Sequence, residues 1–454
     1  MSLFGTDGVR GIPGQGVLSA DSVRRLGLAA ARVFMEARGV LDDGLPPKVF
    51  MGRDTRRSGP TVARWLVEGL ARGGCAVADV GVATTPAVAY LTARRRALFG
   101  VVISASHNPP EFNGIKFFGP SGHKASPAVE HAIEARMPDS GVEPRDRGGA
   151  VWERRPGDVR DYLDFLRSAI PSDCDFGGLR VVLDAGNGAA AMTAPGLLRS
   201  LGAEVFALGC SPNGDNINAG CGALETDAMR RTVVARGADC GIALDGDADR
   251  AVFSDEKGRL LDGDYVIAMA ALDLQRQGLL RGGAVVLTVM SNLGLIRFLE
   301  ANGIGTRQVP VGDRNVTEAL DAEGLSLGGE ASGHIVFRRL APTGDGLATA
   351  LQTLAVLARS KKRMSAFRSL YRTYPQVLKN VRVERRVPLE ELPRTRSEIR
   401  RCEKRLAGKG RVFVRYSGTE PLLRILAEGP DGAEVRALSD HLAKVFREET
   451  DLKK

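Results

Sequence analysis

An aspartate cluster in the segment 244–250, LDGDADR, is the part of this 454-residue sequence that points most directly to chemistry. Asp245, Asp247 and Asp249 stand at alternate positions, and in a tight loop alternate carboxylates can face one hard cation, which oxygen ligands suit. The alternatives are a solvated acidic turn and an EF-hand-like calcium loop, but an EF-hand needs glycine at its sixth position, where this chain has Arg250. Three carboxylates alone leave coordination positions open. The segment therefore predicts a Mg²⁺ site whose remaining ligand comes from a substrate or a phosphate.

A second polar segment lies between two apolar runs in 101–118, VVISASHNPPEFNGIKFF. By itself it could be an ordinary turn whose serines make only local hydrogen bonds. Beside a metal site it suggests more, because a phosphoryl group on Ser106 would supply the missing oxygen ligand and the metal would neutralise its charge. His107 and Lys116, which lies across an expected hairpin, are then the acid–base candidates for a sugar hydroxyl.

The segment 329–334, GEASGH, offers a third set of polar side chains. Glu330 and Ser332 are two positions apart, so both can reach one face of an extended ligand such as a sugar, and His334 follows. An ordinary turn with a capping serine is the alternative.

The segment 415–424, RYSGTEPLLR, is typical of a phosphate-binding turn. Hydroxyl groups, the N–H groups around a flexible glycine and two arginines suit a phosphate, and Thr-Glu-Pro can start a helix whose N-terminus adds its dipole. A capping box alone is the alternative. The expected phosphate contacts are Arg415, Ser417, Gly418 and Thr419. A second Gly-rich turn, GTDGVR, ends in Arg10 and could face the same ligand.

A repeated plan must position these loops. The segments 47–74, 179–204 and 283–304 each read as an apolar strand, a polar turn and a helix, and each is followed by a second apolar segment. The segments 101–122, 240–258 and 325–344 each read as two apolar strands around a polar loop. Three homologous mixed-sheet α/β domains are therefore expected, each with one polar loop at the same place, where loops at strand ends bind ligands.

Domain boundaries follow from changes in composition. The polar segment 138–158 reads as a linker, a second break lies near 255–263, and a third follows Tyr374-Pro375. The tail has its own strand patterns and a helix at 432–449, which predicts a smaller α+β domain. The expected domains are 1–155, with the serine loop; 156–257, with the metal loop; 258–373, with the sugar loop; and 374–454, with the phosphate loop.

The charge and composition narrow the class of function. The formal charge is +9, but the basic residues are scattered and aromatic residues are 5%, so nucleic-acid binding is disfavoured and an anionic small substrate fits better. None of the 6 cysteines forms a CxxC pair, which favours buried thiols. The N-terminal segment lacks a signal-peptide pattern and no apolar run approaches membrane-spanning length, so a cytoplasmic protein without membrane partners is expected.

Six segments in this order resemble the α-D-phosphohexomutase superfamily, and within it the bacterial phosphoglucosamine mutase family. They are FGTDGVRG (4–11), SASHNPPEFNGIKFF (104–118), DGDADR (245–250), VGDRNV (311–316), GGEASGH (328–334) and RYSGTEPLLR (415–424). The resemblance covers essentially the full chain. It implies four domains, three of them homologous, in a heart-shaped α/β protein with a central cleft, and it admits a homodimer.

The resemblance also implies residue roles. Ser106 would be the phosphoserine, and its phosphate would share Mg²⁺ with the three aspartates, with Arg250 assisting. Lys116 and His107 would be the acid–base pair. Substrate contacts would be Arg10, Glu330, Ser332, His334, Arg415, Ser417, Gly418, Thr419 and Arg424.

The implied reaction converts glucosamine 6-phosphate reversibly to glucosamine 1-phosphate through a glucosamine 1,6-bisphosphate, with a sugar 1,6-bisphosphate as activator. Position 331 is Ala, where Gln is commoner in glucosamine-type enzymes. The alternative is therefore a phosphoglucomutase or phosphomannomutase of the same superfamily. A non-catalytic sugar-phosphate sensor is a further alternative, which the presence of Ser106, Lys116 and all three aspartates disfavours.

Overall fold

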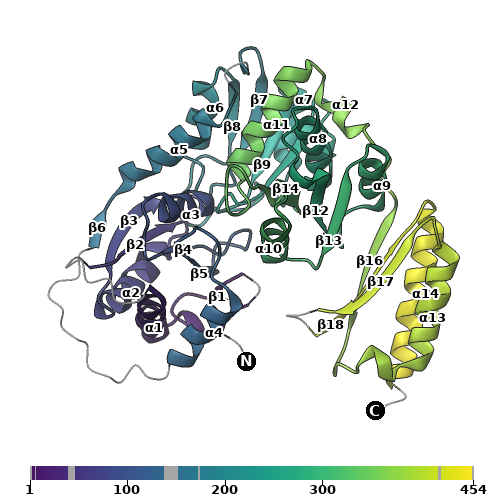
Figure 1. Cartoon of the computed structure of the whole chain (residues 1–454), viewed down its shortest axis with the longest axis horizontal. Helices are drawn as coiled ribbons and strands as arrows, with labels where there is room; N and C mark the ends of the chain where they lie inside the picture. Colours follow the sequence, from purple (N-terminus) through teal and green to yellow (C-terminus); the bar gives the residue numbers. More distant parts are fainter. Residues whose placement is uncertain are drawn as a thin grey trace. The chain divides into compact units, whose positions relative to one another are not determined.

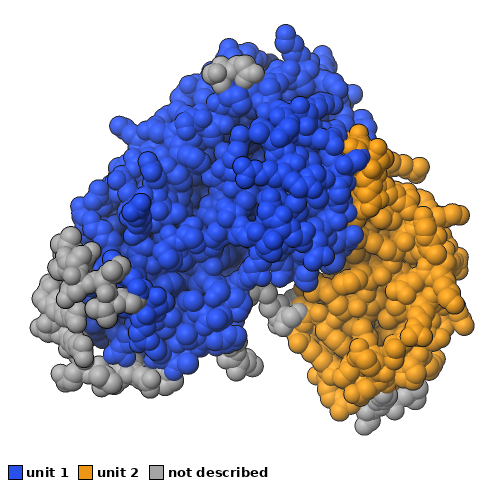
Figure 2. Space-filling model, viewed as in Figure 1, with its two compact units in different colours: residues 1–290, 303–370 blue, residues 291–302, 371–454 orange. Residues whose placement is uncertain are grey.

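The structure is a computed structural model (Figure 1), and it describes residues 3–5, 7–38, 46–137, 152–171, 174–417 and 421–451. The chain forms two compact units, which are coloured separately in Figure 2. Unit 1 consists of residues 1–290 and 303–370, and unit 2 of residues 291–302 and 371–454. No helix among the described residues is both long and apolar enough to span a bilayer.

Unit 1 contains three sheets built to the same plan. In each, the first strand of the repeat lies beside a parallel strand on one side and a hairpin on the other: β3-β2-β4-β5, β8-β7-β9-β10 and β13-β12-β14-β15. The two hairpin strands are antiparallel, and the first of them is parallel to the first strand of the repeat. This confirms the prediction of three homologous mixed-sheet domains.

The first sheet has six strands in the order β1-β5-β4-β2-β3-β6. Its elements are β1 (Val9–Gly11), α1 (Ala20–Arg38), β2 (Lys48–Arg53), α2 (Gly59–Arg72), β3 (Ala76–Val82), α3 (Thr85–Arg94), β4 (Phe99–Ile103), β5 (Asn113–Phe118), α4 (Pro127–Arg136) and β6 (Trp152–Arg154). The expectation that 138–158 is only a linker is wrong at its C-terminal end, because β6 pairs in parallel with β3 at the sheet edge. The rest of that segment up to residue 151 lies outside the described residues.

The second and third sheets repeat this arrangement. The strands of the second sheet and the helices that accompany them are α5 (Val159–Ser168), β7 (Arg180–Asp184), α6 (Ala194–Ser200), β8 (Glu204–Leu208), α7 (Asp227–Arg236), β9 (Cys240–Leu244), β10 (Ala251–Asp255) and β11 (Leu260–Leu261). Those of the third sheet are α8 (Gly263–Arg276), β12 (Ala284–Thr288), β13 (Gly305–Val309), α10 (Asp313–Glu323), β14 (Leu327–Gly329), β15 (Ile335–Phe337), α11 (Gly346–Ser360) and α12 (Met364–Arg368). Every residue of β4 and β9 is buried, as expected for strands covered on both faces.

Unit 2 is an antiparallel sheet in the order β16-β18-β17, with two long helices packed on it. Its elements are β16 (Gln376–Arg382), α13 (Pro393–Leu406), β17 (Arg411–Tyr416), β18 (Leu422–Glu428) and α14 (Gly432–Asp451). Helix α9 (Leu293–Ala301) groups with this unit although its sequence belongs to the third repeat. The Leu293 N–H donates to Glu428 Oε1 at 2.7 Å, and the Asn292 amide donates to Tyr374 O at 3.0 Å. Four short 3₁₀ helices complete the described elements: Gly16–Leu18, Pro156–Asp158, Arg281–Gly283 and Leu389–Glu391.

Helices α1 and α2 approach each other closely at Gly27 and Gly69. A Cβ atom at position 69 would lie 2.1 Å from Arg24 O, and one at position 27 would lie 2.6 Å from Leu66 O. Gly69→Ala is therefore expected to lower the free energy of unfolding by about 1–3 kcal/mol, because the two helices must separate. Thermal unfolding measures the change.

Gly196→Ala is the matched control for this prediction. Gly196 lies within α6, and a Cβ there would meet nothing within 4 Å, so alanine is expected to be neutral or to stabilise by about 0.5–1 kcal/mol. If Gly69→Ala lowered the melting temperature no more than Gly196→Ala does, the close packing of α1 on α2 would be contradicted.

Candidate active site

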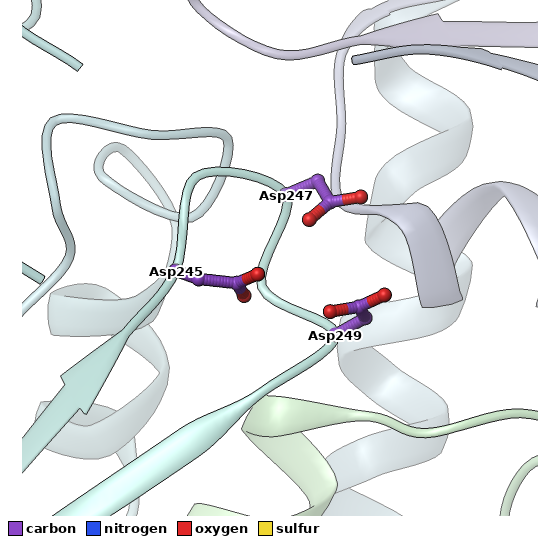
Figure 3. Close-up of side chains that lie close together, drawn as sticks. All are labelled: Asp245, Asp247 and Asp249. Carbon is purple, nitrogen blue, oxygen red and sulfur yellow. The ribbon is translucent and has the colours of Figure 1, made fainter. Parts of the chain in front are cut away.

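The three predicted aspartates converge in the loop between β9 and β10 (Figure 3). One carboxylate oxygen from each of Asp245, Asp247 and Asp249 lies within 4.8 Å of the others, and all three side chains are buried. Ala248 takes a left-handed conformation with φ +57°, which turns the loop back toward β10. Oδ1 of Asp247 and Oδ1 of Asp249 accept no hydrogen bond within the described part of the chain. Such buried carboxylate oxygens without donors fit a bound divalent cation.

The crowding of three buried carboxylates in this loop shifts the pKa values of Asp245 and Asp249 in opposite directions. Burial, and then the negative charges of Asp249 and Asp247, raise the pKa of Asp245 well above its usual range. Burial would also raise the pKa of Asp249, but the Lys116 ammonium and the nearby His334 and Arg250 hold it well below its usual range. A divalent cation would relieve the repulsion between these carboxylates.

Ser106 meets the acidic loop directly. Its Oγ donates to Asp245 Oδ2 at 2.8 Å and lies 3.2 Å from His107 Nδ1. The two loops approach so closely that a Cβ at Gly246 would lie 2.5 Å from Ser106 O, which explains the glycine in DGDADR. The structure thus brings together the serine loop of the first sheet and the metal loop of the second.

Lys116 and His107, the two acid–base candidates, have opposite electrostatic surroundings. Lys116 Nζ lies 2.9 Å from Asp247 Oδ2 and 2.9 Å from Asp7 Oδ2. Burial would lower the pKa of Lys116, but Asp247, Asp7 and Asp249 raise it overall, so the side chain is a cation at neutral pH. Burial and then the Arg250 and Arg10 charges lower the pKa of His107 to about 4, so its imidazole is neutral there.

The sequence motifs did not identify a network of ion pairs that surrounds Lys116. Asp7 pairs with Arg10, Lys116 and Lys124, and Lys124 also pairs with Asp313 of helix α10. Asp7 and Asp313 lie in two of the quoted motifs, so their positions were a usable signal, whereas Lys124 lies in none. Thr85, at the start of α3, donates its hydroxyl to Asp247 Oδ2 at 2.6 Å and was also missed.

The two predicted arginines of unit 1 lie beside these loops. Arg10 Nη1 donates to Asn108 Oδ1 at 2.6 Å, so this side chain reaches the serine loop. The Arg250 backbone N–H donates to Asp245 Oδ1 at 3.1 Å, and its Nε lies 3.8 Å from Asp249 Oδ1. Both arginines therefore add positive charge next to the acidic cluster.

The predicted sugar-binding side chains lie in the β14–β15 hairpin of the third sheet. Glu330 Oε1 accepts the Gly312 N–H at 3.0 Å, and the Ser332 hydroxyl donates to Glu330 Oε2 at 3.4 Å. His334 is buried; its Nε2 accepts the Gly344 N–H at 3.2 Å, and its Nδ1 lies 3.7 Å from Asp249 Oδ2. Burial would lower the pKa of His334, but the neighbouring Asp249 carboxylate raises it overall. His334 thus links the sugar loop to the acidic loop.

The predicted phosphate-binding residues belong to unit 2, where the expectation of a helix starting at Thr-Glu-Pro is wrong, because strand β18 (Leu422–Glu428) follows. Arg415 on β17 and Arg424 on β18 stand opposite each other in the sheet register. Burial and then the Arg424 charge lower the pKa of Arg415, and like charges at paired positions repel, so an anion bound there would be favourable. The Ser417 N–H donates to Leu422 O at 2.8 Å. Gly418 and Thr419 lie outside the described residues.

Comparison with known proteins gives full-length matches. Models of the phosphoglucomutase/phosphomannomutase family match residues 1–141 (alpha/beta/alpha domain I), 160–258 (alpha/beta/alpha domain II), 262–374 (alpha/beta/alpha domain III) and 378–445 (C-terminal domain). A phosphoglucosamine mutase of Symbiobacterium thermophilum is 46% identical over 452 residues, covering 98% of this chain and 99% of that one. One of Paracoccus denitrificans is 46% identical over 443 residues, covering 97% of each.

Solved structures match over nearly the whole chain as well. A phosphoglucomutase/phosphomannomutase family protein of Burkholderia thailandensis has a TM-score of 0.82 at 24% identity, covering 99% of this chain and 98% of that one. An N-acetylphosphoglucosamine mutase of Aspergillus fumigatus, in complex with GlcNAc-6P and magnesium, has a TM-score of 0.68 at 19% identity, covering 98% of this chain and 95% of that one. At these identities the likeness shows a common fold.

Proposed function

Because this chain belongs to the phosphoglucomutase/phosphomannomutase family, we propose that it is a phosphoglucosamine mutase, an isomerase that interconverts glucosamine 6-phosphate and glucosamine 1-phosphate. The observation that carries the proposal is the likeness to relatives of that name, at 43% to 46% identity over nearly the full chain. The contact of Ser106 with the acidic loop supports a phosphoryl-transfer reaction. The product would feed UDP-N-acetylglucosamine synthesis.

The reaction begins with a phosphoryl group on Ser106. The O1 hydroxyl of glucosamine 6-phosphate attacks the phosphorus, the bond from phosphorus to Ser106 Oγ breaks, and glucosamine 1,6-bisphosphate forms. The proton leaves the sugar hydroxyl, and Ser106 Oγ gains one. We assign this proton transfer to Lys116 and His107, which lie within reach of the acidic loop and of Ser106 Oγ respectively.

The second half-reaction requires the bisphosphate to turn around. Ser106 then takes the phosphoryl group from O6, which leaves glucosamine 1-phosphate and restores the phosphoserine. Asp245, Asp247 and Asp249 would hold Mg²⁺ together with the Ser106 phosphate, and that ion would stabilise charge on the transferred group. Arg250 adds positive charge beside these carboxylates.

The remaining predicted residues would bind the part of the substrate that does not react. Glu330 and Ser332 would contact sugar hydroxyls, with His334 close by. The phosphate that is not transferred would be bound by Arg415, Ser417, Gly418 and Thr419, with Arg424 adding positive charge, and Arg10 would be a further substrate contact. One reaction centre and one phosphate site serve both half-reactions because the sugar reorients between them.

A sugar 1,6-bisphosphate would serve as activator, because it can phosphorylate Ser106 when that residue has lost its phosphoryl group. A solved structure of similar fold, an N-acetylphosphoglucosamine mutase of Aspergillus fumigatus, contains glucose 1,6-bisphosphate. We also propose a cytoplasmic location, which the 6 cysteines support because all are thiols, as in a reducing compartment.

The test is kcat/KM for glucosamine 6-phosphate, glucose 1-phosphate and mannose 1-phosphate, each with Mg²⁺ and catalytic sugar bisphosphate. A preference for the amino sugar is the expected result and would mean that Ala331 is compatible with that specificity. A preference for glucose or mannose 1-phosphate would keep the mechanism and overturn the substrate. Activity on none of them would favour a sugar-phosphate sensor.

Arg415→Ala is expected to raise KM for the sugar phosphate about 10- to 100-fold, because charge-assisted hydrogen bonds to phosphate are among the stronger polar contacts. The Mg²⁺ concentration that gives half-maximal activity should stay the same, since the aspartates belong to another part of the chain. Arg436→Ala, at an exposed position on α14 of the same unit, is the control and should leave KM unchanged. An unchanged KM in Arg415→Ala would place the phosphate site elsewhere.

A further inference from the structure

A buried guanidinium binds the backbone of the loop that carries Ser106. The side chain of Arg56, three residues after the end of β2, has 0% exposure. Its Nη2 donates to Ser106 O at 3.0 Å and to Asn108 O at 2.8 Å. Its Nη1 donates to Phe112 O at 3.0 Å and also to Pro109 O. Four carbonyl oxygens of one loop therefore share a single buried cation.

Asp54 extends this contact to the other side of Ser106. Its Oδ2 accepts from Arg56 Nε at 2.9 Å and from the Ser104 hydroxyl at 2.6 Å. The Ser104 Oγ in turn accepts the Ser106 N–H at 2.8 Å. The N–H and the C=O of Ser106 are thus both held, one through Ser104 and the other by Arg56, and both connections meet at Asp54.

The conformation held in this way is an unfavourable one. Ser106 has φ +52°, in the left-handed region, which costs roughly 1–2 kcal/mol for a residue with a Cβ and persists only where the surroundings impose it. In this conformation its Oγ lies 2.8 Å from Asp245 Oδ2. A loop free to relax would move the hydroxyl away from the acidic cluster.

A second anchor comes from the next sheet. Asn218 Nδ2 donates to Ser106 O at 2.9 Å and to Asn108 O at 3.1 Å, two of the carbonyls that Arg56 also binds. Asn218 itself has φ +58°, a conformation that glycine adopts without strain.

We propose that Arg56, held by Asp54, is a positioning residue that fixes Ser106 for phosphoryl transfer. This inference rests on the proposed function, because it assumes that Ser106 carries the transferred group. Lysine could not replace the arginine, since a planar fork with five donors spans several carbonyls, whereas an ammonium concentrates three donors at one point.

The test is Arg56→Lys, examined in the full-length enzyme charged with sugar bisphosphate. The fraction of protein phosphorylated at Ser106 is measured by mass spectrometry, and single-turnover transfer to glucosamine 6-phosphate is expressed per phosphoserine. The rate is expected to fall about 30- to 100-fold with KM unchanged within about twofold, because a misplacement near 1 Å can cost two orders of magnitude. A purely structural role would lower the melting temperature and leave the rate per phosphoserine unchanged.

Two further variants complete the design. Arg57→Lys changes the neighbouring arginine, whose side chain is 70% exposed and pairs with Asp215, and should have no effect on the rate. Asn218→Gly keeps the backbone conformation but removes two donors, and should lower the rate per phosphoserine about three- to tenfold. This variant also tests whether the bonds to the loop carbonyls position Ser106 if Arg56→Lys does not fold.

The outcomes separate the two proposals. Phosphoserine at position 106 with an unchanged transfer rate in Arg56→Lys, or in Asn218→Gly if the first variant does not fold, would overturn the positioning role and leave the proposed function intact. Absence of phosphate from Ser106 in the charged wild-type enzyme would overturn both.

Discussion

Replacing Ser106 with alanine is expected to lower turnover by about four orders of magnitude or more, because no other group can take its place as the phosphoryl carrier. The fold should remain intact, since alanine adopts φ +52° about as readily as serine, and the main loss is one hydrogen bond to Asp245. The measurement is a coupled assay of glucosamine 1-phosphate formation, together with the melting temperature.

Ser168→Ala is the matched control for this experiment. Ser168 lies at the end of α5, and its hydroxyl donates to the local carbonyl of Phe165 at 2.7 Å. This variant should keep full activity. Turnover in Ser106→Ala within tenfold of the wild-type value would contradict the phosphoserine assignment.

Removal of divalent metal should have the second largest effect. Treatment with EDTA is expected to lower turnover by about three orders of magnitude or more, because charge on the transferred phosphoryl group then lacks its main stabilisation, and Mg²⁺ should restore activity. Asp247→Asn should produce a similar loss that Mg²⁺ does not restore, since Oδ1 of Asp247 is one of the buried oxygens that have no hydrogen-bond donor among the described residues.

A binding measurement distinguishes a metal site from a general electrostatic effect. Mg²⁺ should raise the melting temperature of the wild-type enzyme, because a ligand that binds only the folded state stabilises it, and it should not raise that of Asp247→Asn. Asp227→Asn, on the exposed face of α7 where Asp227 pairs with Arg230, is the control and should respond like wild type. An enzyme indifferent to EDTA would remove the metal role of the three aspartates.

The repeated α/β plan could be predicted from sequence because its signals are local. A buried strand such as β4 or β9 is a short apolar run, and the polar loop that follows each of them interrupts the run visibly. The antiparallel pairing of β4 with β5 confirms the expected hairpin, in which Lys116 lies opposite Val102 and Ser106 follows in the loop. The proximity of these residues to the aspartates followed only from the assumption that equivalent loops meet.

The missed parts depend on contacts between residues distant in sequence. Arg56 gives no motif of its own, and its function is visible only because it is fully buried against a loop some 50 residues away. The edge strand β6 has three residues, all exposed, so pairing with β3 rather than any apolar pattern defines it. Helix α13 was missed because its sequence is dominated by basic residues, with few buried positions.

Helix α9 has a consequence for the synthesis of this protein. It groups with unit 2 but is encoded between strands β12 and β13 of unit 1, so the chain crosses from one unit to the other three times. During translation α9 leaves the ribosome well before Tyr374 and Glu428, its hydrogen-bond partners near its N-terminus, have been made. The surface of α9 that packs on the rest of unit 2 therefore stays exposed until the C-terminal residues have been synthesised. A fragment beginning at residue 371 would lack the helix and should aggregate more readily than the same sequence within the whole chain.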